Sequence, residues 1–167
     1  GSRAKDGKLY LGGNRVFELT AQGENWEAVG PDLSMNDQEK TTTTGSGAET
    51  YAVVYSLADS PAKPGMLWAG TDDGRVWVGH NGGEQWVDVS AGLPAAARGQ
   101  WVARIEPGHH DDKVAYLAVS AFRSGNYAPL VYRTADQGKT WQSIGEGLPK
   151  DEPVRVVVDH RDADLDG

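Results

Sequence analysis

Apolar and aromatic residues occur along this chain in short runs that end at glycine, asparagine or aspartate. Such runs predict β-strands separated by tight turns. The middle of the chain shows the pattern best, and its four strands are named A to D in chain order. They are expected at Tyr51–Ala58, Met66–Gly70, Arg75–Gly79 and Trp86–Val89.

The same order of strands recurs on both sides of this unit. The next A to D strands are expected at Trp101–Glu106, Val114–Val119, Leu130–Arg133 and Trp141–Ile144. The first unit shows only B to D, at Lys8–Leu11, Arg15–Leu19 and Trp26–Val29. A lone A strand is expected at Pro153–Asp159. The pattern predicts three four-stranded sheets in shifted phase (B-C-D, A-B-C-D, A-B-C-D, A).

Both faces of the middle B and C strands carry apolar residues. Leu67-Trp68-Ala69 and Val76-Trp77-Val78 lack the polar alternation of a sheet that faces water on one side. Blades of a β-propeller pack on neighbours through both faces, and four-stranded repeats of this length are typical of them. The predicted fold class is therefore all-β, a β-propeller, in which Trp68 and Trp77 pack between blades.

A turn that ends in tryptophan occurs once in each unit, at residues 19–26, 79–86 and 134–141. In the third copy, Asp136 is expected to accept backbone hydrogen bonds and Gly138 to adopt a positive φ. Thr140 then begins strand D, and Trp141 buries its ring. Asparagine replaces the aspartate in the second copy, whereas Ala21 replaces it in the first. The residues predicted to hold the other two turns are Asn81, Gly83, Trp86, Gly23 and Trp26.

The third turn, Thr134-x-Asp136-x-Gly138-x-Thr140-Trp141, resembles the Asp-box of BNR-repeat proteins. That group includes sialidases, xyloglucanase-type hydrolases, photosystem II assembly factors and sortilin or VPS10-type receptors. Residues 67–74 and 132–141 look most like bacterial VPS10/sortilin-like BNR proteins. The resemblance implies a propeller, but it does not imply one activity, because the group hosts unrelated functions.

Three blades are fewer than the roughly four to eight of closed propellers. The blade units are expected at residues 8–30 with the terminal strand 153–159, at 51–90 and at 101–145. Two readings stay open: a segment of a longer propeller, or a homodimer in which each chain lends its terminal strand to its partner's first blade. Gly1-Ser2 looks like a cloning remnant, so the native N-terminus is expected to be missing.

Composition narrows the partners. The formal net charge of −8 argues against a nucleic-acid backbone as ligand. Cysteine is absent, and no apolar run approaches the ~20 residues of a membrane span. The absence of cysteine leaves the compartment open, and the family resemblance leads to the expectation of a secreted or periplasmic protein.

One face of the predicted propeller carries long loops, at residues 31–50 and 121–129. Long loops on a rigid scaffold commonly bind ligands, although the first, rich in threonine and glycine, also fits a spacer. Trp101 begins an inner strand near the central channel. Asp72 and Asp73 lie in a tight turn, and turn formation is their alternative role. The candidate ligand face comprises Asp72, Asp73, Arg98, Trp101, Arg123 and Tyr127.

Catalytic and metal motifs are weak. A glycosidase needs two carboxylates about 5–9.5 Å apart, and a sialidase also needs an arginine cluster and an Arg-Ile-Pro element, neither of which is evident. His109-His110-Asp111-Asp112 fits a solvated turn. The C-terminal acidic residues resemble the start of a calcium loop without its glutamate. No cofactor is expected, with calcium as the alternative at Asp162, Asp164 and Asp166.

The leading functional hypothesis is a non-catalytic propeller module that binds a peptide, protein or glycan on the long-loop face. The alternative is part of a secreted BNR-type glycoside hydrolase, which predicts a carboxylate pair in an open cleft. A third reading is a scaffold whose exposed blade flanks form the interface.

Overall fold

The computed structural model describes residues 2–3, 8–19, 23, 25–35 and 52–159. Within these ranges, twelve β-strands form three antiparallel sheets of four strands each, and the remaining ordered elements are short 3-10 turns. The predicted Asp162, Asp164 and Asp166 calcium site, Ala21, and most of the loop at 31–50 lie outside the described residues.

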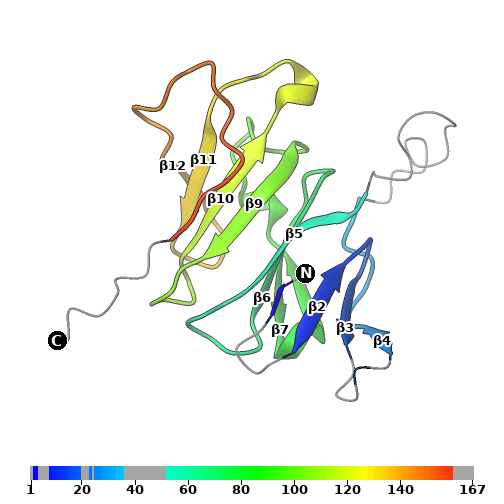
Figure 1. Cartoon of the computed structure of the whole chain (residues 1–167). Coiled ribbons are helices and arrows are strands. Elements are labelled where there is room, and N and C mark those ends of the chain that lie inside the picture. Colours follow the sequence, from blue (N-terminus) through cyan, green and yellow to red (C-terminus); the bar gives the residue numbers. More distant parts are fainter. Residues whose placement is uncertain (1, 4–7, 20–22, 24, 36–51, 160–167) are drawn as a thin grey trace, which may run out of the picture.

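The strands follow one another across each sheet in chain order (Figure 1). The first sheet contains β1 (Ser2–Arg3), β2 (Leu9–Gly12), β3 (Val16–Leu19) and β4 (Trp26–Ala28). The second contains β5 (Val54–Asp59), β6 (Leu67–Thr71), β7 (Val76–His80) and β8 (Gln85–Asp88). The third contains β9 (Trp101–Pro107), β10 (Ala115–Ser120), β11 (Leu130–Thr134) and β12 (Gln142–Ser143).

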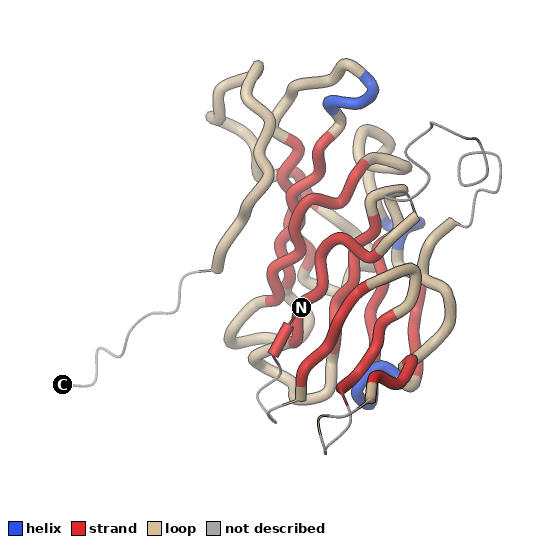
Figure 2. The backbone as a smooth tube through the Cα atoms, turned by 45° about the vertical axis from the view of Figure 1, so that its right-hand side comes forward, coloured by secondary structure: helices blue, strands red, loops and turns tan. Residues whose placement is uncertain are grey.

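The first strands of the sheets lie on the inside of the assembly. Strand β5 packs against β9, and β1 and β2 lie against β5. The tube view shows the three sheets side by side, joined by loops at both ends (Figure 2). The 3-10 turns η2 (Asn81–Gly83), η3 (Ser90–Gly92) and η4 (Phe122–Ser124) lie in these connections.

Two apolar cores hold the sheets together, one at each junction. Trp68 of β6 is fully buried in the core between the second and third sheets, where its ring meets that of Trp141 edge-on at 6.2 Å. Leu67 and Ala69 point the other way, into the core shared with the first sheet, and Trp77 packs on that core. Every residue of β6 is buried. The prediction that both faces of the middle unit are packed is therefore confirmed.

The glycines of the second and third tryptophan turns lie against the valine that follows the last strand of the preceding sheet. A Cβ on Gly83 would lie 3.1 Å from the Val29 side chain, and one on Gly138 would lie 2.7 Å from Val89. The indole of Trp86 also donates to the carbonyl of Val29 at 3.1 Å. The second and third turns thus take part in the contact between neighbouring sheets.

The inner strand of the first sheet differs from the sequence expectation. Ser2–Arg3 pairs with β2 and supplies the fourth strand, which the sequence assigned to residues 153–159. A two-residue strand has too few positions to show an alternating pattern. Residues 153–159 form no strand in the described structure, because no neighbouring strand pairs with them.

Candidate functional site: a groove between the inner strands

Strands β5 and β9 each contain one β-bulge at the same place. In β5, Val54 and Ser56 pair with consecutive residues of β6 and leave Tyr55 without a partner position. In β9, Val102 and Arg104 pair with consecutive residues of β10 and leave Ala103 unmatched. A bulge re-aims the side chain of the extra residue and is common beside binding sites.

Both bulge residues line a groove of about 530 Å³ between the inner strands. Its walls come from β2, β5, β9, the end of β10 and the segment after β12. The groove is lined by Leu11, Gly12, Val54, Tyr55, Ser56, Leu57, Trp101, Ala103, Arg104, Ser120, Arg155 and Val156. None of these side chains carries a carboxylate.

An aromatic and cationic cluster forms one end of the groove. The Tyr55 ring meets Trp101 edge-on with centroids 4.6 Å apart, and Phe122 of η4 lies 5.8 Å from Trp101. The Arg123 guanidinium lies 4.9 Å from the Trp101 ring centre, and that of Arg155 lies 5.8 Å from Phe122. Both distances are within reach of cation–π attraction. The structure thus brings the predicted Trp101 and Arg123 together.

The segment after β12 runs along β9 in the same direction. Arg155 lies at the end of β9 that holds Trp101, and Asp159 lies at the other end, where its Oδ2 accepts the backbone N–H of His109 at 3.0 Å. The His109 ring is also 3.7 Å from that carboxylate oxygen. This segment therefore lies beside β9, but it pairs with no strand of the described structure.

Two buried polar atoms at the groove have no hydrogen-bond partner among the described residues. One is Oγ of Ser120, whose residue is 1% exposed, and the other is Nε1 of Trp101. The two residues are paired across β9 and β10. Both atoms are able to donate a hydrogen bond, and leaving them unpaired is unfavourable unless a ligand or water accepts.

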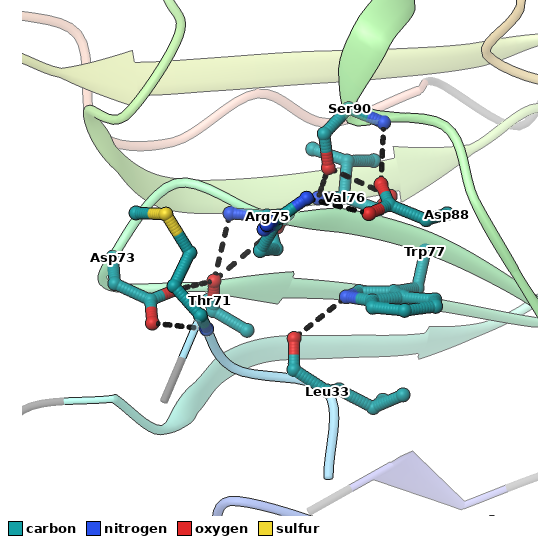
Figure 3. Close-up of polar contacts among 9 residues, drawn as sticks. Leu33, Thr71, Asp73, Arg75, Val76, Trp77, Asp88 and Ser90 are labelled. Carbon is teal, nitrogen blue, oxygen red and sulfur yellow. Dashed lines mark hydrogen bonds and ion pairs between the residues drawn. The ribbon is translucent and has the colours of Figure 1, made fainter. Parts of the chain in front are cut away.

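Asp72 and Asp73 bind backbone rather than facing the groove. Asp73 is 1% exposed, and its Oδ2 accepts the N–H of Met35 at 2.7 Å while its other oxygen accepts the hydroxyl of Thr71 (Figure 3). Oδ1 of Asp72 accepts the N–H of Val53 at 2.9 Å. Burial raises the pKa of Asp72, and the Val53 hydrogen bond and the positive charge of Arg123 oppose that rise. The two carboxylates fasten the chain on both sides of residues 36–51.

The network around Asp73 continues along β7. Arg75 donates its backbone N–H to the Thr71 hydroxyl at 2.8 Å and forms an ion pair with Asp88 at 2.7 Å. The indole of Trp77 donates to the carbonyl of Leu33 at 2.6 Å. Figure 3 shows these side chains and the contacts between them. These hydrogen bonds join residues of the chain to one another, which indicates a structural role, although Nε of Arg75 is buried without a hydrogen-bond partner among the described residues.

The two remaining residues of the predicted ligand face do not line the groove. Arg98 donates to the carbonyls of Leu93 and Ala91, at 2.8 and 3.0 Å, and so braces its own loop. Tyr127 is 54% exposed and lies in the loop after η4. The sequence grouped them with Trp101 because their loops share one face, but a shared face does not bring side chains into one groove.

The turn at residues 134–141 lies at the opposite end of its sheet. Asp136 accepts the backbone N–H and the hydroxyl of Thr140, at 2.9 and 2.7 Å, and the hydroxyl of Thr134 at 2.8 Å. These bonds lower the pKa of Asp136, with the Thr140 hydroxyl contributing most. Gly138 has φ +82° and Trp141 is 7% exposed. Asn81 of the second turn has φ +52°.

The second turn keeps the backbone form, with Gly83 at φ +95°, and the first keeps Gly23 at φ +70°. Trp26 is 44% exposed in the described structure, unlike its counterparts. Among the described residues, no group of three or more histidine, aspartate or glutamate side chains has a geometry suited to a metal ion. No helix of the described part is long and apolar enough to cross a membrane.

Sequence reasoning missed Tyr55, Phe122, Ser120 and Arg155. The signal for two of them is the repeat itself. Aligning the inner segments on Val54, Val102 and Val154 places Tyr55, Ala103 and Arg155 at one position. Phe122 and Ser120 have no such signal, because their roles follow from the path of η4 and from burial at the end of β10.

Several solved structures have folds similar to this arrangement of sheets. An ancestral GH74 enzyme matches with a TM-score of 0.57 and 24% identity, over 87% of this chain and 17% of the enzyme. The GH74 xyloglucanase from Xanthomonas campestris matches with a TM-score of 0.54 and 21% identity, over 86% of this chain and 22% of the enzyme. A structure of YCF48 bound to D1 peptide matches with a TM-score of 0.53 and 15% identity, over 89% of this chain and 40% of YCF48.

The three sheets are blades of a β-propeller. The GH74 enzymes and YCF48 are propeller proteins, and the fold-class prediction is confirmed. No family model matches the sequence, and a search of curated proteins finds no match. This chain covers less than half of each of the three solved chains described above. At these identities the likeness shows the fold alone.

Proposed function

We propose that this chain is a non-catalytic part of a propeller that binds an extended peptide in the groove between its inner strands. The groove lies where the re-aimed residues of two bulged strands meet an aromatic cluster, and its volume falls in the usual range of ligand pockets. The single observation that carries the proposal is this combination of Tyr55 and Trp101 with exposed arginines in one concave site.

The groove chemistry favours binding over hydrolysis. A glycosidase needs an acid and a second carboxylate about 5–9.5 Å apart, and none of the described groove residues supplies one. The alternative function, a part of a glycoside hydrolase, has the fold likeness to GH74 enzymes as its support.

A peptide fits the groove better than a sugar ring. Sugars stack on open aromatic faces, whereas the Trp101 ring has Arg123 over it and Tyr55 against it. The inner strands also offer backbone edges to an extended chain, a common mode of peptide recognition. A solved propeller of the same fold, YCF48, is bound to a peptide.

The groove belongs, in this proposal, to a complete propeller of which the chain supplies three blades. The resemblance of the tryptophan turns to the Asp-box supports a place among BNR-repeat propellers of the VPS10/sortilin-like type, acting outside the cytoplasm. The ring closes through further blades, from a longer chain or from a second copy. Light scattering on a sizing column distinguishes these: a dimer favours the second copy.

A groove-blocking variant tests the function. Random peptides displayed on phage are selected on the wild-type chain, and each selected peptide is then measured on Ala103→Trp, which places an indole in the groove. The matched control is Lys139→Trp, an exposed residue in the turn of the opposite end. We expect Ala103→Trp to weaken binding by about a hundredfold, through loss of about 3 kcal/mol, and the control to leave it unchanged.

Equal binding to wild type and Ala103→Trp would show that the groove is not the peptide site. Release of reducing sugar from xyloglucan by the wild-type chain would contradict the non-catalytic part of the proposal.

A further inference from the structure

The charge of the groove is opposite to that of the protein. The chain has a formal net charge of −8, yet three arginines, Arg104, Arg123 and Arg155, lie in or beside the groove. None of the described residues that line the groove carries a carboxylate. A concave site of one sign on a protein of the other sign focuses its field on ligands of the protein's own sign. The groove therefore attracts anions to a surface that otherwise repels them.

The guanidinium groups of Arg123 and Arg155 are held by rings rather than by strong ion pairs. Arg123 lies over Trp101, and Arg155 lies over Phe122. Stacking on an aromatic face positions a guanidinium while its N–H edge stays free to bind an anion. Asp72 contributes an attraction to Arg123, but its Oδ1 is engaged with the Val53 backbone. Arg104 differs, because Glu106 binds it at 2.7 Å.

The two buried polar atoms of the groove add a further argument. Oγ of Ser120 and Nε1 of Trp101 both have donor hydrogens and no partner among the described residues. Ser120 is 1% exposed and is one of the residues that line the groove. Donors next to arginines match the acceptor-only oxygens of a carboxylate.

We infer that the groove selects acidic peptides and reads their side-chain carboxylates through Arg123, Arg155 and the Ser120–Trp101 donors. This inference rests on the proposed function, because it specifies the peptide that the same groove binds. An extended peptide places alternate side chains on one face, so a segment with glutamate at every second position presents carboxylates along the groove. Ala103, whose side chain is small, lines the groove together with Tyr55 and Arg155.

The test uses a synthetic peptide of alternating glycine and glutamate, blocked at both ends so that all carboxylates are on side chains. Isothermal titration measures its affinity for the wild-type chain and for Arg123→Gln, Arg155→Gln and Ser120→Ala. Each arginine substitution removes a charge-assisted hydrogen bond, so we expect about tenfold weaker binding. Ser120→Ala should weaken it about threefold. Arg133→Gln, which removes the same charge from β11 outside the groove, is the matched control.

Two further ligands test whether the groove requires carboxylates and whether they must be on a peptide. The glycine–glutamine version of the peptide should bind at least about tenfold more weakly than the acidic one. An oligogalacturonate carries carboxylates on sugar rings, and tighter binding of this glycan than of the acidic peptide would overturn the inference. Equal loss with Arg133→Gln and with Arg155→Gln would also overturn it, because it would show a general charge effect.

The failure of this inference differs from failure of the proposed function. If selected peptides bind the groove and are lost in Ala103→Trp, but glutamine replaces glutamate without effect, acid selectivity is wrong and the groove function stands. If the acidic peptide binds Ala103→Trp as well as wild type, the groove is not where it binds and both are wrong for this ligand.

Discussion

Asp73, in the turn between β6 and β7, accepts a hydrogen bond from the backbone N–H of Met35 at 2.7 Å, across 38 residues of sequence. Its neighbour Asp72 accepts from Val53 at 2.9 Å. The two carboxylates differ in their hydrogen bonds. Both oxygens of Asp73 accept a hydrogen bond, whereas Oδ2 of Asp72 is buried without a partner in the described structure. This difference separates two isosteric substitutions.

Asp73→Asn should lower the free energy of unfolding by about 1–3 kcal/mol, because an amide N–H₂ replaces an oxygen that must accept. Urea denaturation at neutral pH measures the change. Asp151→Asn, at an exposed site, is the control and should have little effect. A stability of Asp73→Asn equal to that of wild type would show that the clamp on Met35 contributes nothing.

Asp72→Asn should leave stability at neutral pH unchanged or raise it. Burial raises the pKa of Asp72 above its ordinary value of 3.8. The folded state then binds a proton more readily than the unfolded state. Protonation of Asp72 therefore stabilises the fold at low pH, and this stabilisation is lost as pH rises through the folded pKa. The amide keeps an acceptor for Val53 without the buried charge. Urea denaturation as a function of pH checks the sign, and a clear loss of stability at neutral pH would contradict it.

Thr140→Val should raise the pKa of Asp136 toward its ordinary value of 3.8. The hydroxyl of Thr140 is the largest cause of the lowered pKa. Because the folded pKa is depressed, the stabilisation is present above pH 3.8 and is lost as pH falls through the lower folded value. Carboxyl NMR signals of Asp136 followed with pH measure the shift. Thr20→Val, outside this turn, is the control, and an unchanged Asp136 titration in Thr140→Val would contradict the assignment.

Gly138→Ala should destabilise the protein more than Gly147→Ala. Both glycines have positive φ, at +82° and +87°, so both substitutions carry strain of about 1–2 kcal/mol. Only at Gly138 does a new Cβ meet a neighbour, the Val89 side chain at 2.7 Å, whereas nothing lies within 4 Å at Gly147. Overpacking adds about 1–3 kcal/mol. Equal losses of unfolding free energy in urea denaturation would show that the contact of residue 138 with Val89 adjusts to the new Cβ without cost.

The blades were predictable because their signals are local. Short apolar runs, turn residues and the repeated glycine and tryptophan mark each sheet, and apolar residues on both faces of β6 indicate packing between blades. The short strand β1 was not predictable, since two residues carry no pattern. For the same reason the sequence assigned the inner strand of the first sheet to residues 153–159.

The groove was predictable only in part. Loop length and strand order placed Trp101 and Arg123 together, and the structure has both at one end of the groove. Asp72 and Asp73 have the same turn position, but their carboxylates are engaged with Met35 and Val53, which lie far from them in sequence. Long-range backbone partners leave no sequence pattern. The alignment of the repeats, which places Tyr55 and Arg155 at one position, points to these two groove residues, whereas loop length does not.

The most direct test of the central claim follows the indole N–H of Trp101 by NMR while a groove-selected peptide is added. Trp101→Phe assigns the signal among the six tryptophans of the chain. We predict that the Trp101 signal shifts on binding while those of Trp68 and Trp141, buried between blades, stay in place. An unchanged Trp101 signal at saturating peptide would contradict a binding site in this groove.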